Sequence, residues 1–149
     1  MSRIAIVTDS ASNLPEPLMR EYGIHVVPLE IRFGNELLLD GVDITSNQFY
    51  ERLRNVKDRL PTTSQPPVGK FYELYQRLIG AADAIVSVHV SGRLSGTLSA
   101  AQQAASMLPE VPIRLVDSLS ASIGEGAAVL AAARAASAGG ALDRVVDAA

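Results

Sequence analysis

The 149-residue sequence contains no cysteine and no tryptophan, and aromatic residues make up only 5% of it. The absence of cysteine excludes disulfides and thiolate metal sites. No apolar run approaches the roughly 20 residues that a membrane-spanning helix needs. The apolar stretch near the start, Ile4 to Val7, is too short and wrongly flanked for a signal peptide. We therefore expect no transmembrane segment and a cytoplasmic location.

A strong excess of charge is also missing. The 13 basic and 16 acidic residues give a net charge of −3, so no general affinity for polyanions follows and nucleic acid is not an expected partner. Hydrophobic residues make up 48% and charged residues 19%, which is typical of a globular chain. A chain of this length fits a single domain, residues 1–149, that buries roughly two-thirds of its unfolded surface.

Strand patterns alternate with helical patterns along the chain. Strands are predicted at 3–8, 24–33 with an interruption at Pro28, 84–90 and 113–116, with a small antiparallel excursion at 36–39. Helices are predicted between Pro15 and Gly23, from Thr45 or Ser46 to Leu53, at 68–78, from Leu98 toward Pro109, at 123–138 and from Leu142. Three prolines predict an extended loop at 60–67. This alternation indicates an α/β fold of three layers, α/β/α, around a mainly parallel sheet.

The segment 91–97 lies between a predicted strand and an Ala-rich helix. The free N–H groups and the dipole at such a helix start favour an anion, and this loop adds Ser91, Gly92, Ser95 and Thr97 without any carboxylate. We expect a carboxylate or phosphate head group here. Simple capping of the helix by Ser95 or Thr97 is the alternative. Arg93 either pairs with the anion or covers a neighbour.

Two other predicted strands are each followed by a loop that begins with an Asp-Ser pair, Asp9-Ser10 and Asp117-Ser118. Because the carboxyl ends of parallel strands share one edge of the sheet, these loops should lie near 91–97. The two aspartates either hold a cation or brace their loops. The position of Thr62-Thr63-Ser64 near this edge is inferred from chemistry alone, and local turn hydrogen bonds are the alternative.

Motifs for catalysis are missing. Residues 92–96 have one residue too many before the serine for a nucleophile elbow, and 124–129 have Val129 in place of the third glycine of a dinucleotide fingerprint. His25 and His89 lie inside predicted strands, which favours packing over catalysis. No set of residues has the spacing of metal ligands. We therefore expect that the protein is not an enzyme and that it has no cofactor and no metal site.

Seven segments together resemble the DegV family of bacterial fatty-acid-binding proteins. They are 7–15, Val27-Pro28-Leu29, 40–44, Phe49-Tyr50, Pro61-Thr62-Thr63-Ser64-Gln65-Pro66, Leu94-Ser95-Gly96-Thr97 and Val116-Asp117-Ser118. The resemblance implies a non-catalytic carrier of a long-chain, palmitate-like fatty acid, which in some members is presented to a partner fatty acid kinase.

The resemblance also implies where the ligand binds and which domain of the family this chain corresponds to. Thr63 takes the place of the head-group hydroxyl, and Ser91 and Gly92 take the places of a serine pair, so a glycine stands where the family usually has the second serine. The full set expected at the carboxylate is Thr63, Ser64, Ser91, Gly92, Ser95, Ser10 and Ser118. Family members are nearly twice as long, and their C-terminal domain forms the other wall of the acyl tunnel. The chain thus resembles the N-terminal domain alone, which predicts weak lipid binding and a possible homodimer through an exposed apolar face.

Two other functions remain open at this point. A small phosphoryl- or acyl-transfer enzyme would use the same loops, with Asp9 and Asp117 holding Mg²⁺. An interaction module would use the dimer face itself as its function.

Overall fold

A parallel sheet forms the centre of the protein. The computed structural model describes residues 3–57 and 59–149. Four strands, β1 (Ile4–Asp9), β2 (His25–Val27), β6 (Ala84–His89) and β7 (Ile113–Asp117), pair in the order β2-β1-β6-β7. Every pairing in this sheet is parallel, and all six residues of β6 are buried. The predicted mainly parallel sheet is confirmed.

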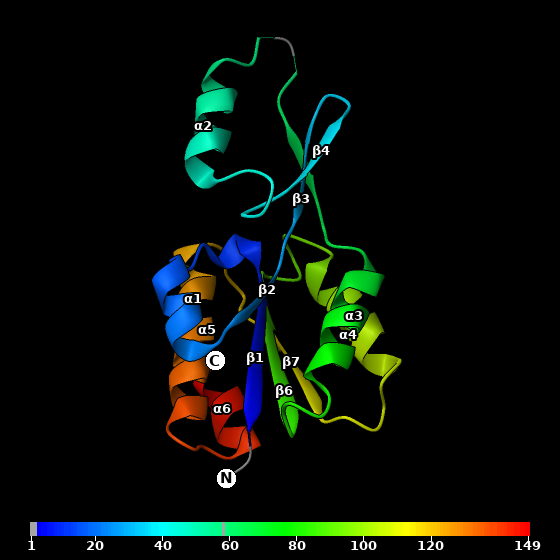
Figure 1. The fold of residues 1–149 in the computed structure, drawn as a ribbon, viewed down its shortest axis with the longest axis vertical. Helices are drawn as coiled ribbons and strands as arrows, with labels where there is room; N and C mark the ends of the chain where they lie inside the picture. Colours follow the sequence, from blue (N-terminus) through cyan, green and yellow to red (C-terminus); the bar gives the residue numbers. More distant parts are fainter. Residues whose placement is uncertain (1–2, 58) are drawn as a thin grey trace.

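Helices cover both faces of this sheet (Figure 1). On one face lie α1 (Glu16–Tyr22), α5 (Ile123–Ser137) and α6 (Leu142–Ala148), and on the other lie α3 (Val68–Leu78) and α4 (Thr97–Ser106). The sheet therefore has a hydrophobic core on each side. Phe71, Tyr75 and Ala101 belong to the first, whereas Val86, Val129 and Val145 belong to the second. The three-layer α/β/α architecture is confirmed. Within 3–57 and 59–149, no helix is both long and apolar enough to cross a bilayer.

A second, antiparallel sheet lies beyond the strand exits of the first. It contains β3 (Glu30–Phe33), β4 (Glu36–Leu39) and β5 (Thr62–Ser64) in the order β4-β3-β5, and α2 (Ser46–Arg54) lies beside it (Figure 1). The ring of Phe49 on α2 meets Phe33 edge to face at 5.7 Å. A capping box between Thr45 and Gln48 starts α2, so of the two predicted capping residues, Thr45 and Ser46, the first is the cap.

The predicted interruption of the 24–33 strand region at Pro28 is confirmed, and its two parts join different sheets: β2 joins the parallel sheet and β3 the antiparallel one. Another prediction for this region needs correction. The extended loop predicted at 60–67 contains a strand, β5, in which Thr63 pairs with Ile31. All three residues of β5 are exposed, so no alternation of apolar and polar residues marks it in the sequence. The prolines stand outside its three residues, where they do not interrupt the ladder.

Candidate functional site

Three loops meet at the carboxyl edge of the parallel sheet, as predicted. They follow β1 as the short 3₁₀ helix η1 (Ser10–Ser12), β6 as 90–96, and β7 as 118–122. Backbone hydrogen bonds tie them together: the Ser91 N–H donates to the Ser120 carbonyl at 2.8 Å, and the Ser122 N–H donates to the Ala11 carbonyl at 2.9 Å. This edge is therefore one connected surface built from distant parts of the chain.

A cavity of about 540 Å³ opens at this edge. It brings together Thr63 and Ser64 from β5 with Ser95 from the loop before α4, so three of the residues expected at a carboxylate line one cavity. The described lining residues are Ala11, Leu29, Thr63, Ser64, Gln65, Val90, Leu94, Ser95, Gly96 and Ala121. None of these lining residues carries a negative charge, but Ser64 Oγ donates to the Glu30 carboxylate at 3.1 Å, so one acid lies next to this wall.

Gln65 joins the two walls of this cavity. Its side chain lies directly against Gly96, because a Cβ built on that glycine would come within 2.0 Å of Gln65 Oε1. The glycine therefore makes room for the amide of the Thr-Thr-Ser-Gln-Pro segment. Sequence reasoning did not assign a role to Gln65, and the only signal was that both residues belong to motifs of one family.

The segment 91–97 keeps most of its polar groups occupied. Ser91 is buried, and its Oγ accepts from the Arg93 N–H at 3.3 Å. Ser95 Oγ lies 2.8 Å from Thr97 Oγ1 and accepts from the Thr97 N–H at 3.2 Å. The N-cap of α4 is Gly96, which has no side-chain cap, so neither Ser95 nor Thr97 is the helix cap named as the alternative. The Gly92 N–H donates to the Asp117 carboxylate at 3.2 Å, so Gly92 braces the loop through Asp117.

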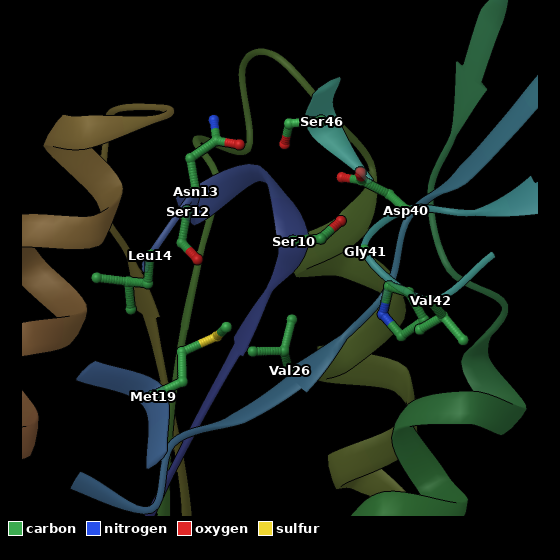
Figure 2. A pocket seen from close by; sticks show the side chains of 11 residues that line it. Ser10, Ser12, Asn13, Leu14, Met19, Val26, Asp40, Gly41, Val42 and Ser46 are labelled. Atoms are coloured by element: carbon green, nitrogen blue, oxygen red, sulfur yellow. The ribbon is translucent and has the colours of Figure 1, made fainter. Parts of the chain in front are cut away.

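Ser10 and Ser118 have other surroundings. Ser10 Oγ accepts from the Leu29 N–H at 3.0 Å and lines a separate cavity of about 260 Å³. Figure 2 shows Ser10, Asp40 and Ser46 around that cavity, between η1 and the segment that follows β4. Ser118 Oγ donates to the Ser120 carbonyl at 3.2 Å. The structure does not bring Ser10 into the cavity that Thr63 and Ser95 share.

A third cavity, of about 300 Å³, adjoins the first. The two share Ala11, Leu29, Thr63 and Ala121 as lining residues. Beyond Thr63 the described walls include the apolar side chains of Ile31, Phe49 and Tyr50, from β3 and α2. We call the cavity of about 540 Å³ the polar cavity and the one of about 300 Å³ the apolar cavity. The wall of the apolar cavity also includes the polar residues Asn13, Asp40, Ser46 and Ser122, but Ile31, Phe49 and Tyr50 give it the hydrocarbon surface that an apolar tail needs.

A chain of buried polar side chains runs beneath this edge. Tyr75 Oη lies 2.9 Å from Ser87 Oγ, Ser87 Oγ lies 2.7 Å from His89 Nε2, and His89 Nδ1 lies 2.9 Å from Asp9 Oδ2. All four residues are fully buried. The serine, histidine and aspartate have the order of a hydrolase triad, but no substrate can reach them, so their role is structural. Sequence reasoning missed Ser87, because one partner, His89, was assigned to packing and the other, Tyr75, lies twelve residues earlier on another element.

Both aspartates of the strand exits brace loops. Asp9 accepts from the Ala11 N–H at 3.0 Å and the Val90 N–H at 3.1 Å, and Asp117 accepts from the N–H groups of Gly92 and Leu119. Within 3–57 and 59–149, no group of three His, Cys, Asp or Glu residues could hold a metal ion. The bracing role named at the outset therefore describes both residues, and the geometry gives no support to a Mg²⁺ site.

Comparison with known proteins gives relatives along the whole chain. One, a DegV domain-containing protein of Caldanaerobacter subterraneus subsp. tengcongensis, is 39% identical over 98% of this chain and 51% of its own length. Another, from Streptomyces coelicolor, is 44% identical over 100% of this chain and 53% of its own length. A DegV domain-containing 15.5 kDa protein of Staphylococcus aureus is 38% identical over 85% of this chain and 88% of its own length. The chain thus spans about half the length of the first two relatives.

Solved structures show the same fold. A fatty-acid-binding DegV family protein of Thermus thermophilus matches with a TM-score of 0.89 and 36% identity, over 97% of this chain and 51% of that one. DegV of Bacillus subtilis, a fatty acid binding protein, matches with a TM-score of 0.92 and 32% identity, over 99% of this chain and 52% of that one. The family model described as an uncharacterised protein of the DegV family matches residues 3–149. The chain belongs to the DegV family.

Proposed function

We propose that this chain binds a long-chain fatty acid. The observation that carries the proposal is the continuity of the two cavities through Thr63, which lines both. The carboxylate lies in the polar cavity, near Thr63, Ser64 and Ser95 at the start of α4, and the acyl chain runs toward Ile31, Phe49 and Tyr50. The fatty acid binding of the Thermus thermophilus and Bacillus subtilis proteins supports the same ligand class.

The protein acts as a carrier in this proposal and performs no reaction on its ligand. The one serine–histidine–aspartate arrangement described above is fully buried, and none of its three residues lines either cavity. A carboxylate held at the open edge of the sheet is available for presentation to a fatty acid kinase, as the family resemblance implies. Ser91, Gly92, Ser10 and Ser118 support the surrounding loops rather than touching the ligand.

This domain corresponds to the N-terminal half of a two-domain carrier in our proposal. Three large apolar side chains are strongly exposed at the same edge: Leu94 at 70%, Leu119 at 74% and Ile123 at 83%. Such exposure marks a surface that another body covers. A second domain placed there completes the acyl tunnel, and self-association in a homodimer is the alternative that sedimentation analysis distinguishes. Without a cover, each exposed methylene of the ligand forgoes about 0.8 kcal/mol.

Thr63→Ala should weaken palmitate binding about tenfold, because one hydrogen bond to a charged group contributes about 1.5 kcal/mol or more. Titration calorimetry or displacement of a fluorescent fatty acid measures the change. The matched control is Thr62→Ala, which removes the same side chain from the neighbouring position of β5 and should leave affinity unchanged. Equal effects of the two substitutions would count against a head group at Thr63.

Tyr50→Ala should lower palmitate affinity about fivefold, because a partly exposed aromatic ring in the apolar cavity contributes about 1 kcal/mol to an acyl chain. Octanoate, whose acyl chain is half as long, should lose less affinity than palmitate does. Leu37→Ala is the control, since Leu37 is a partly exposed apolar residue of β4. A loss that is the same for palmitate and octanoate would place the acyl chain elsewhere.

A further inference from the structure

A buried acid that no part of the proposed function uses lies in the first turn of α5. Glu125 is fully buried, and its Oε1 accepts from Thr8 Oγ1 at 3.3 Å. Within 3–57 and 59–149, its Oε2 is the buried side-chain oxygen that lacks a hydrogen-bond partner. An ionised carboxylate in such a place is unstable, because burial removes it from water without supplying donors.

Asp9 is a second fully buried carboxylate beside Glu125: after burial itself, the charge and hydrogen bonding of Asp9 are what raise the pKa of Glu125. Two carboxylates in contact cannot both be ionised at low cost, whereas a protonated one donates to the other. Asp9 already accepts three N–H groups, from Ala11, Val90 and His89 Nδ1. A carboxylate has about four acceptor positions, so a proton from Glu125 fills the last of them.

The hydrogen-bond chain on the other side of Asp9 has one consistent direction. If Tyr75 donates to Ser87, Ser87 to His89 Nε2, and His89 Nδ1 to Asp9, every hydrogen in the chain has an acceptor. Asp9 then carries the one negative charge of the cluster, and a charge on Glu125 would be the second. The geometry therefore makes Asp9 the acceptor for both chains and leaves Glu125 as a donor.

We propose that Glu125 stays protonated and donates to Asp9, and that this shared proton positions the Ala11 and Val90 loops that line both sides of the proposed head-group cavity. Glu125 is thus a positioning residue, acting through Asp9. The structural part of the proposal rests on the burial of both carboxylates and on the unpartnered Oε2 of Glu125, and its bearing on a ligand rests on the proposed function.

The pKa agrees with this arrangement. Burial, together with the Asp9 carboxylate, raises the pKa of Glu125 to about 9. Asp9 faces it from β1, and His89 of β6 lies on the far side of Asp9. η1 carries no charge, and the charged residues of the other helices packed on α5 are exposed, namely Glu16, Arg20 and Glu21 of α1 and Asp143, Arg144 and Asp147 of α6. No described cation is therefore placed to keep Glu125 ionised.

The sign of the pH effect follows from this shift. Folding raises the pKa of Glu125, so the folded protein keeps a proton that the unfolded chain releases above about pH 4.5. The equilibrium constant for folding should therefore fall about tenfold for each pH unit up to about pH 9. Glu125→Gln keeps a neutral donor and cannot titrate. The ratio of its folding equilibrium constant to that of the wild type should therefore rise about tenfold for each pH unit over the same range. Glu110→Gln, at an exposed position, should retain the wild-type slope.

Carbon-13 NMR of glutamate-labelled protein tests the proton directly. We expect the Glu125 carboxyl to titrate near pH 9, with the amide nitrogens of Ala11 and Val90 shifting at the same midpoint, and neither amide shifting there in Glu125→Gln. Palmitate affinity should fall at least tenfold between pH 7.5 and pH 10 in the wild type, and less than twofold in Glu125→Gln. Titration of Glu125 near pH 4.5 would overturn the proposal. Amide signals of Ala11 and Val90 that do not shift when Glu125 titrates would overturn it as well. Failure of both proteins to bind palmitate at any pH would overturn only the proposed function.

Discussion

Asp9→Ala should lower the free energy of unfolding by about 4 kcal/mol, the effect of removing one partner from a buried charged hydrogen-bond network. The substitution leaves three donors without an acceptor, namely the N–H groups of Ala11 and Val90 and Nδ1 of His89. All of them depend on a carboxylate that has no access to water. Urea unfolding followed by circular dichroism measures the change.

Asp117→Ala is the matched control for this substitution. Asp117 also follows a strand of the parallel sheet and also accepts backbone N–H groups, from Gly92 and Leu119. It is only half-buried, so water replaces the lost acceptor, and we expect a loss of about 1 kcal/mol. Equal losses for the two variants would show that burial of the Asp9 network contributes nothing beyond ordinary loop bracing.

Gly126→Ala should cost about 3 kcal/mol, at the upper end of what overpacking costs. A Cβ at this position would lie 2.7 Å from the Ser12 carbonyl oxygen and 3.3 Å from Leu14 Cδ2, so η1 and α5 must move apart. The atom in the way belongs to the backbone, which cannot turn aside as a flexible side chain can. Thermal or urea unfolding measures the loss. Its sign is opposite to the usual effect, since alanine normally stabilises a helix by about 1 kcal/mol relative to glycine.

Gly69→Ala supplies the comparison. Gly69 is also helical, in α3, and a Cβ built there meets nothing within 4 Å. The variant should therefore be as stable as the wild type or more stable by up to about 1 kcal/mol. If both alanines stabilised the protein, the close approach of α5 to the Ser12 backbone would be wrong.

Local signals in the sequence were sufficient for the layered core. Pro17 and Gly23 mark the two ends of α1, and Gly23 does adopt the left-handed conformation, with φ at +61°. The apolar spacing of Phe71, Leu74 and Tyr75 predicts α3 with the bounds that the structure shows. Each of these features depends on residues within a few positions of one another, which is why sequence reasoning could find them.

Long-range pairing was beyond the reach of the same reasoning. The partner of β5 is β3, about thirty residues earlier, and the residue types of Thr62, Thr63 and Ser64 do not predict this pairing. The Thr8–Glu125 hydrogen bond joins residues from opposite ends of the chain, and nothing near Glu125 in the sequence distinguishes it from an ordinary acid in the first turn of a helix. The cavity was foreseen only as a meeting of strand exits, because its second wall depends on the pairing of β5.

The cavity has one wall in each sheet, with Thr63 on the antiparallel sheet and Ser95 beside the parallel one. A guest held between them bridges two separately hydrogen-bonded bodies, which the chain joins near Pro28 and again after Ser64. In the proposed function, the residence time of such a guest depends on the contacts between these bodies, Gln65 against Gly96 among them.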